Sequence, residues 1–142
     1  MKDFIETRIL NAVKKLLDQR VNEIFSDWEL LLPVVEFSNF HGRFVVTPVV
    51  FLTTCERTEK ERLIRLDAYT VNVSFTLMEH EDGELYCYGY TAAFVKALGE
   101  DVTLGGIADR AVVTAKKYIQ PKKLNCGEGW GLILTLRITV EE

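Results

Sequence analysis

Two segments of the chain carry apolar residues at every second position, and they constrain the fold more than any other feature. Residues 69–77 read YTVNVSFTL, and residues 131–141 read GLILTLRITVE. The apolar positions are Tyr69, Val71, Val73, Phe75 and Leu77 in the first segment and Leu132, Leu134, Leu136, Ile138 and Val140 in the second. A period of two predicts strands. The sheet that contains them must have one apolar face, which needs a cover, and one wetter face.

The N-terminal region supplies a suitable cover. Residues 3–26 place their apolar side chains on one arc at helical spacing, which predicts a long amphipathic helix. The members of this arc are Ile5, Ile9, Val13, Leu16, Leu17 and Ile24. Asp3 and Glu6 lie near the positive end of the helix dipole, where carboxylates are favoured.

A second helix is expected in residues 80–101, HEDGELYCYGYTAAFVKALGED, although two signals conflict there. Asp82-Gly83 is typical of a hairpin turn. Against this, Tyr86, Tyr90 and Phe94 recur at helical spacing, and Leu98-Gly99 resembles a glycine-capped helix end. The spacing favours a helix over residues 84–98.

The remaining apolar segments are short and rich in β-branched residues, as strands are. They include LLPVVEF, GRFVVTPVVFLTT and Ala111–Ala115, and Pro33 and Pro48 are expected at strand ends or on an edge. The order is helix, three or more strands, helix, two strands. With 142 residues, 48% of them hydrophobic and 27% charged, the chain is expected to form a single α+β domain over residues 1–142. Its two helices pack on one face of a mostly antiparallel β-sheet.

Charge is concentrated in two places. Glu56–Arg62 holds six charged residues in seven positions and is expected to project as a solvated hairpin loop. A basic connection is expected after the strand Ala111–Ala115, with Lys116, Lys117, Lys122 and Lys123 around Tyr118. These lysines are interpreted as a solvated surface, with an ionic protein contact or a nucleic-acid backbone as alternatives. The net charge of −4 argues against a broad DNA-binding face.

The paired glycines of TLGGIADR, Gly105 and Gly106, could cradle a phosphate or allow a turn. A nucleotide-binding P-loop needs G-x-x-x-x-G-K-[ST], and a dinucleotide fingerprint needs G-x-G-x-x-G. This segment has neither spacing, so a turn with positive φ is the prediction.

No residue set points to catalysis, a cofactor or a metal. His80 lies among acids in an expected turn, and His41 precedes a glycine in another. Cys55, Cys87 and Cys126 include no CxxC pair and are expected to be buried or inert thiols. The aromatic group Tyr86, Tyr88, Tyr90 and Phe94 is expected in the core, with a ligand pocket as the alternative. No apolar stretch is long enough to span a membrane, and the first residues do not read as a signal peptide.

The C-terminal third resembles a known family. TLGGIADRAVVTAKKY followed by PKKLNCGEGWGLILTLRITVE is similar to the end of the small tail-terminator or tail-completion proteins of long-tailed bacteriophages and prophages. The resemblance is carried by the Leu-Gly-Gly turn, by Lys-Lys-Tyr followed by proline, and by the tryptophan that leads the last strand. The order of elements extends it to the whole chain.

This resemblance implies a structural protein without enzymatic activity. It would assemble with itself, typically as a hexamer ring on the last ring of the tail tube, stop tube growth and offer a surface to the head connector protein. It would be found in the host bacterial cytoplasm during assembly and then in the virion tail, without a membrane or a sequence-specific nucleic acid as partner.

The two charged segments would then provide subunit or tube contacts. Arg57, Glu59, Lys60, Glu61 and Arg62 would line or grip the ring lumen, and Lys116, Lys117, Lys122 and Lys123 would contact a neighbour or the tube. Two alternatives stay open: another head–tail connector component, and a small-ligand-binding domain that uses the aromatic group.

Overall fold

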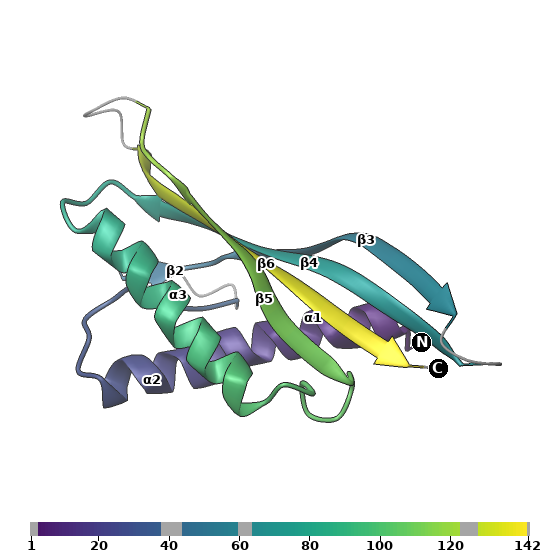
Figure 1. The fold of residues 1–142 in the computed structure, drawn as a ribbon. Helices are drawn as coiled ribbons and strands as arrows, with labels where there is room; N and C mark the ends of the chain where they lie inside the picture. Colours follow the sequence, from purple (N-terminus) through teal and green to yellow (C-terminus); the bar gives the residue numbers. More distant parts are fainter. Residues whose placement is uncertain (1–2, 38–43, 60–63, 123–127, 142) are drawn as a thin grey trace.

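The computed structural model describes residues 3–37, 44–59, 64–122 and 128–141 as an α+β fold (Figure 1). In chain order the elements are α1 (Ile5–Lys15), the π-helical segment η1 (Leu16–Val21), α2 (Asn22–Asp27), β1 (Val34–Val35), β2 (Val45–Val46), β3 (Val49–Glu59), β4 (Arg65–Met78), α3 (Gly83–Glu100), β5 (Arg110–Ile119) and β6 (Glu128–Glu141). The predicted order of helices and strands is confirmed.

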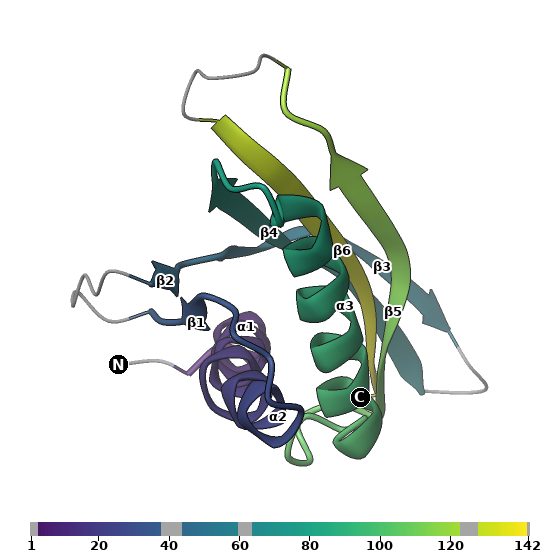
Figure 2. The ribbon, with the colours of Figure 1, turned by 90° about the vertical axis from the view of Figure 1, so that its left-hand side faces the viewer.

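The main sheet has four antiparallel strands in the order β3-β4-β6-β5. The two alternating segments are its central neighbours, and Val73 of β4 pairs with Leu134 of β6. The apolar side chains of their alternating positions are buried beneath α1, η1, α2 and α3, except for half-buried Val140, and these helices all lie on one side of the sheet (Figure 2). β1 and β2 form a separate parallel pair. Pro33 directly precedes β1 and Pro48 lies between β2 and β3, so both prolines are at strand ends as expected.

The N-terminal helix is confirmed, and its middle is a π-helix. The predicted range 3–26 corresponds to the continuous helical run of residues 5–27. Four fully buried residues of the run, Ile9, Val13, Leu17 and Val21, recur at every fourth position, and buried Ile24 and Phe25 follow them. In a regular α-helix with 3.6 residues per turn such a series would drift around the axis. The wider turn of η1 offsets that drift and keeps the series on the sheet.

Asn22, at the end of this π-helical segment, ties the helix to β1. Its Nδ2 donates to the carbonyl oxygens of Asp18 (2.8 Å) and Val35 (2.9 Å), and its Oδ1 accepts the Val35 N–H at 2.9 Å. The Asn22 side chain therefore satisfies both the N–H and the C=O of Val35, which lies in the β1–β2 pair.

The second helix is also confirmed, but it ends later than expected. α3 continues through Gly99 to Glu100, so Gly99 is not a C-cap. Arg20 of η1 binds the carboxylate of Glu100 at 2.9 Å and anchors this last turn. A tertiary contact therefore extends the helix beyond its local stop signal.

Two segments predicted to lie outside strands belong to the sheet. Glu56, Arg57 and Glu59 are in β3 rather than in a loop, and Lys116 and Lys117 are in β5 rather than in a basic connection. The reason is pairing with the adjacent strand of the sheet: Glu56 lies opposite Ala68 of β4, and Lys116 lies opposite Leu134 of β6. Lys60, Glu61, Arg62 and Lys123 lie outside the described residues.

Candidate functional site

The glycine pair forms a turn, as predicted. Gly105 and Gly106 have φ values of +71° and +89°. The Gly105 N–H donates to Asp101 Oδ1 at 3.0 Å, and the Gly106 N–H donates to Thr103 Oγ1 at 3.2 Å. A phosphate-binding loop presents backbone N–H groups to its ligand. Here both N–H groups donate to side chains of the same turn, Asp101 and Thr103, and do not point at an open phosphate site.

Arg57, expected in a lumen-lining loop, instead binds a buried carboxylate. Its Nε and Nη2 donate to the two carboxylate oxygens of Asp67 at 2.7 and 2.8 Å. The Asp67 side chain is 4% exposed, whereas that of Arg57 is 50% exposed. The hydrogen bonds from Arg57 lower the pKa of Asp67 below its usual value. Arg57 therefore stabilises the β3–β4 hairpin, while Glu59 beside it is exposed.

The lysines of β5 do not form a single basic patch. Lys116 pairs with Leu134 and so points to the helix side of the sheet, whereas Lys117 pairs with Ile133 and points to the opposite side. Lys122 is exposed beyond the end of the strand. Because these side chains are divided between two faces, they do not form the continuous groove expected of a nucleic-acid backbone site.

The predicted aromatic group is divided between the core and the surface. Tyr90 and Phe94 are fully buried, which confirms the core interpretation for these two, whereas Tyr88 is 46% exposed and the core interpretation is wrong for it. The Tyr90 hydroxyl donates to the Pro33 carbonyl at 2.6 Å, and its ring stacks on Phe75 with centroids 4.8 Å apart. Burial raises the pKa of Tyr90.

Tyr86 is half-buried and borders a pocket. Its ring stacks on His80 with centroids 4.9 Å apart, and the Asp82 N–H donates to His80 Nδ1 at 3.0 Å. The pocket has a volume of about 300 Å³, and its walls include Phe44, Val46 and Met78. If the protein binds a small ligand, as in the alternative interpretation of the aromatic group, this pocket would be the binding site. His80 belongs to no group of three or more metal-ligating side chains among the described residues, and His41 lies outside them.

The thiols differ in exposure. Cys87 is buried, as expected, and burial raises its pKa to about 11. Cys55 is exposed on β3, so of the two expected alternatives, buried or inert, the first does not hold for this residue. Desolvation raises the pKa of its thiol. Cys126 is not among the described residues.

The face of the main sheet that points away from the helices has no covering layer in the described part of the chain (Figure 2). Strand pairing aligns the side chains of this face in rows: Val49, Ser74, Ile133 and Lys117 form one row, and Phe51, Asn72, Thr135 and Ala115 form the next. The Thr135 hydroxyl donates to Asn72 Oδ1 at 2.8 Å. Val49 and Phe51 are 60% and 40% exposed. We call these two rows the open face.

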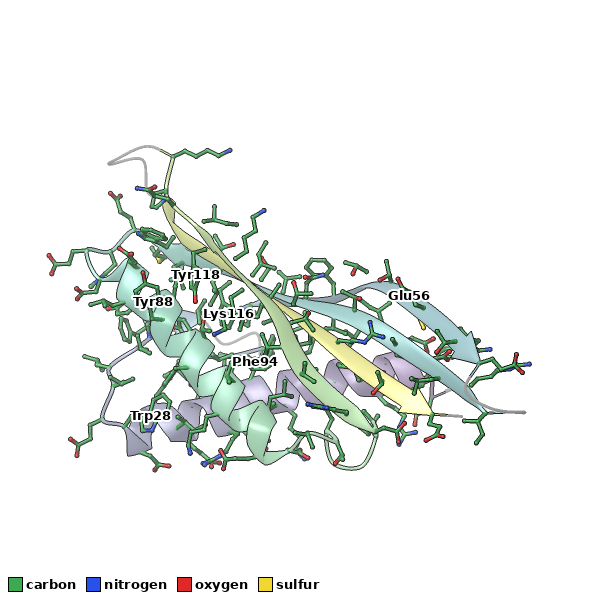
Figure 3. All side chains as sticks on the ribbon, viewed as in Figure 1. Trp28, Glu56, Tyr88, Phe94, Lys116 and Tyr118 are labelled. Atoms are coloured by element: carbon green, nitrogen blue, oxygen red, sulfur yellow. The ribbon has the colours of Figure 1, made fainter. Side chains whose placement is uncertain are left out.

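A second surface was missed in the sequence. Leu85, Tyr88, Ala92, Val95 and Gly99 are all exposed along α3 and are separated by alternating steps of three and four residues. We call this set the α3 stripe. Tyr88 packs edge-on against Tyr118 of β5, with centroids 5.5 Å apart (Figure 3). The signal was available, because these residues fill the helical positions between those assigned to the core.

Comparisons with known proteins give no family assignment. The chain matches no protein-family model, and a search of the curated proteins finds no match. Within its described residues, no helix is long and apolar enough to cross a membrane.

Proposed function

We propose that this protein is a non-enzymatic structural component of a phage or prophage tail. In this proposal six copies form a ring on the end of the tail tube, end its polymerisation and present a surface to the head connector. The proposal rests on the resemblance of the C-terminal third and on one structural observation, the open face.

The open face has the composition of a protein contact surface. Val49 and Phe51 are apolar and exposed, and they lie beside hydrogen-bonded Thr and Asn side chains. Interfaces that must also exist free in solution combine apolar contacts with polar groups in this way. This uncovered face can therefore dock on a preformed tube end without refolding.

The test is to mix the purified protein with assembled tail tubes and image the tube ends by negative stain. We expect extra density at one end of each tube. Phe51→Ser should remove that density, because the substitution removes a large exposed apolar side chain from the open face. Leu31→Ser is the matched control, since Leu31 is 83% exposed but lies outside the sheet. Bare tube ends with the unchanged protein would refute the capping function.

The pocket beside Tyr86 and His80 supports a second candidate, a small-ligand-binding domain. Its volume of about 300 Å³ is at the lower end of ligand sites. A thermal-shift screen with nucleotides, metals and metabolites separates the two functions, because a bound ligand raises the melting temperature by mass action. A shift that Tyr86→Ala abolishes would favour the ligand-binding function.

A further inference from the structure

The α3 stripe gives this helix two apolar faces. One face packs on the sheet through Tyr90, Phe94 and other buried residues. The opposite face exposes 63% of Leu85 and 46% of Tyr88. Val102, just beyond the helix, continues the stripe. Glu84, Lys96 and Glu100 are also exposed on α3, but a contiguous exposed apolar row of this kind marks an interaction surface.

Large side chains stand in the N-terminal half of the stripe and small residues follow toward its C-terminal end, so a reversed copy of the stripe places large residues against small ones. We propose that two copies of this chain pair through α3, antiparallel and related by a twofold axis near the helix midpoint. In that arrangement Tyr88 faces Gly99 of the second copy, Val95 faces Ala92, and Leu85 faces Val102. Each of the first two pairs joins a large side chain to a small one. A twofold interface must be self-complementary in this way.

A groove lies where the second copy's large side chains would enter. It has a volume of about 370 Å³ between the C-terminal half of α3 and β5, and its walls include Val95, Gly99, Val102 and Val113. A Cβ atom placed on Gly99 would meet no other atom within 4 Å, so the space above this glycine is open. The ring of Tyr88 from the second copy fits this position.

Charge complements the same arrangement. Glu84 lies at the N-terminal end of the stripe, where it accepts a hydrogen bond of 2.6 Å from the Tyr88 hydroxyl of its own copy, and Arg110 and Lys116 line the groove at the C-terminal half of α3. Antiparallel pairing brings Glu84 of one copy to Arg110 of the other, and the twofold axis repeats the contact. Opposite charges placed this way fix the register of an interface. The inference concerns the free protein and does not depend on the capping function.

The oligomeric state of the full chain tests this inference. We expect sedimentation velocity over a range of concentrations to show a monomer–dimer equilibrium. Gly99→Leu should raise the dissociation constant about ten-fold or more, because it fills the space for Tyr88. Lys96→Ala is the matched control on the same exposed side of α3 and should dimerise like the unchanged protein. A monomer at every concentration, or a dimer indifferent to Gly99→Leu, would overturn the inference.

A charge exchange tests the register itself. Glu84→Arg and Arg110→Glu each place like charges together, so each variant alone should dimerise weakly. An equimolar mixture of the two variants should recover the dimer, because each copy's exchanged side chain then faces a residue of opposite charge on the other copy. Circular dichroism of each variant verifies that it is folded. No recovery on mixing, or assembly that continues beyond a dimer, contradicts the twofold arrangement.

Discussion

Arg57 and Asp67 face each other across the β3–β4 hairpin and share two hydrogen bonds of 2.7 and 2.8 Å. The carboxylate is buried, and the guanidinium lies partly in solvent. The pair thus connects the charged end of β3 to the interior. Its removal should affect the stability of the fold before it affects any partner.

We expect Arg57→Gln to lower the free energy of unfolding by about 1–2 kcal/mol. A hydrogen bond to a charged group contributes about 1.5–3 kcal/mol, and solvent around the guanidinium reduces that value. Urea denaturation measures the loss. Glu59→Gln, an exposed change two residues later in the same strand, is the control and should cost less than about 0.5 kcal/mol. Equal losses in the two variants would show that the pair has no special role.

The same pair should make stability depend on pH. The pKa of Asp67 is lowered in the folded protein, so the contribution of its charge is fully present above the unfolded value of about 3.9. It is lost as the pH falls below that value and through the folded pKa. The stability difference between the unchanged protein and Arg57→Gln should therefore shrink as the pH falls below about 4. Melting temperatures of both proteins across this range measure the trend, and a constant difference would contradict it.

Asn22→Ala should loosen β1 from the helix. The substitution leaves the Val35 N–H and C=O without the side chain that now binds both. We expect a loss of about 1–3 kcal/mol, the usual cost of unsatisfied groups away from water. Hydrogen exchange at the Val35 amide should accelerate. Asn11→Ala removes the same side chain from an exposed position of the same helix and should leave that exchange rate unchanged.

Gly105→Ala should destabilise the protein by about 1–2 kcal/mol through its backbone alone, because a side chain is strained in the left-handed region. The added Cβ would meet no other atom within 4 Å, so crowding does not contribute. Gly105→Asn should cost less, since asparagine tolerates positive φ. Thermal unfolding of the two variants ranks them, and the reverse order would mean that strain does not decide this position.

The described thiols should differ in reactivity. Cys55 is exposed and Cys87 is buried with a pKa raised to about 11. Desolvation also raises the pKa of Cys55, but its thiol is open to solvent. Iodoacetamide at a pH of about 8.5 should therefore modify Cys55 slowly in the native protein and reach Cys87 only after unfolding. Mass spectrometry of the peptides reads the result, and native labelling of Cys87 would indicate that the start of α3 opens.

Strict periodicity made most of the architecture predictable. In β4 and β6 the apolar residues recur at every second position, and in α1 and α3 they recur at helical spacing. Because these apolar side chains must be buried, the spacing predicts both the type of each element and the face that packs on the core. The ends of β3 and β5 could not be predicted in the same way. Glu56 and Lys116 look like loop residues locally, and only pairing with Ala68 and Leu134 keeps them in strands.

The interaction surfaces were less predictable than the fold. The helical spacing of Tyr86, Tyr90 and Phe94 predicted the buried side of α3. Tyr88 was assigned to the same core although it is exposed, and Leu85 and Val95 beside it were not considered. Arg57 was expected to line the lumen of a ring because its charged neighbours predict a loop. Its contact with Asp67 depends on the pairing of β3 with β4 and cannot be predicted from the local sequence. A charged residue's role depends on what faces it, and a linear sequence does not state that.

The strand order β3-β4-β6-β5 places the last described strand inside the sheet. β5 is hydrogen-bonded within the sheet only to β6, so it has no neighbour until β6 leaves the ribosome. During synthesis the gap beside β4 therefore stays open until β6 has been made. A premature stop codon shortly before Glu128 would thus remove β6 and leave β5 without its partner in the sheet. The core beneath both strands would be uncovered.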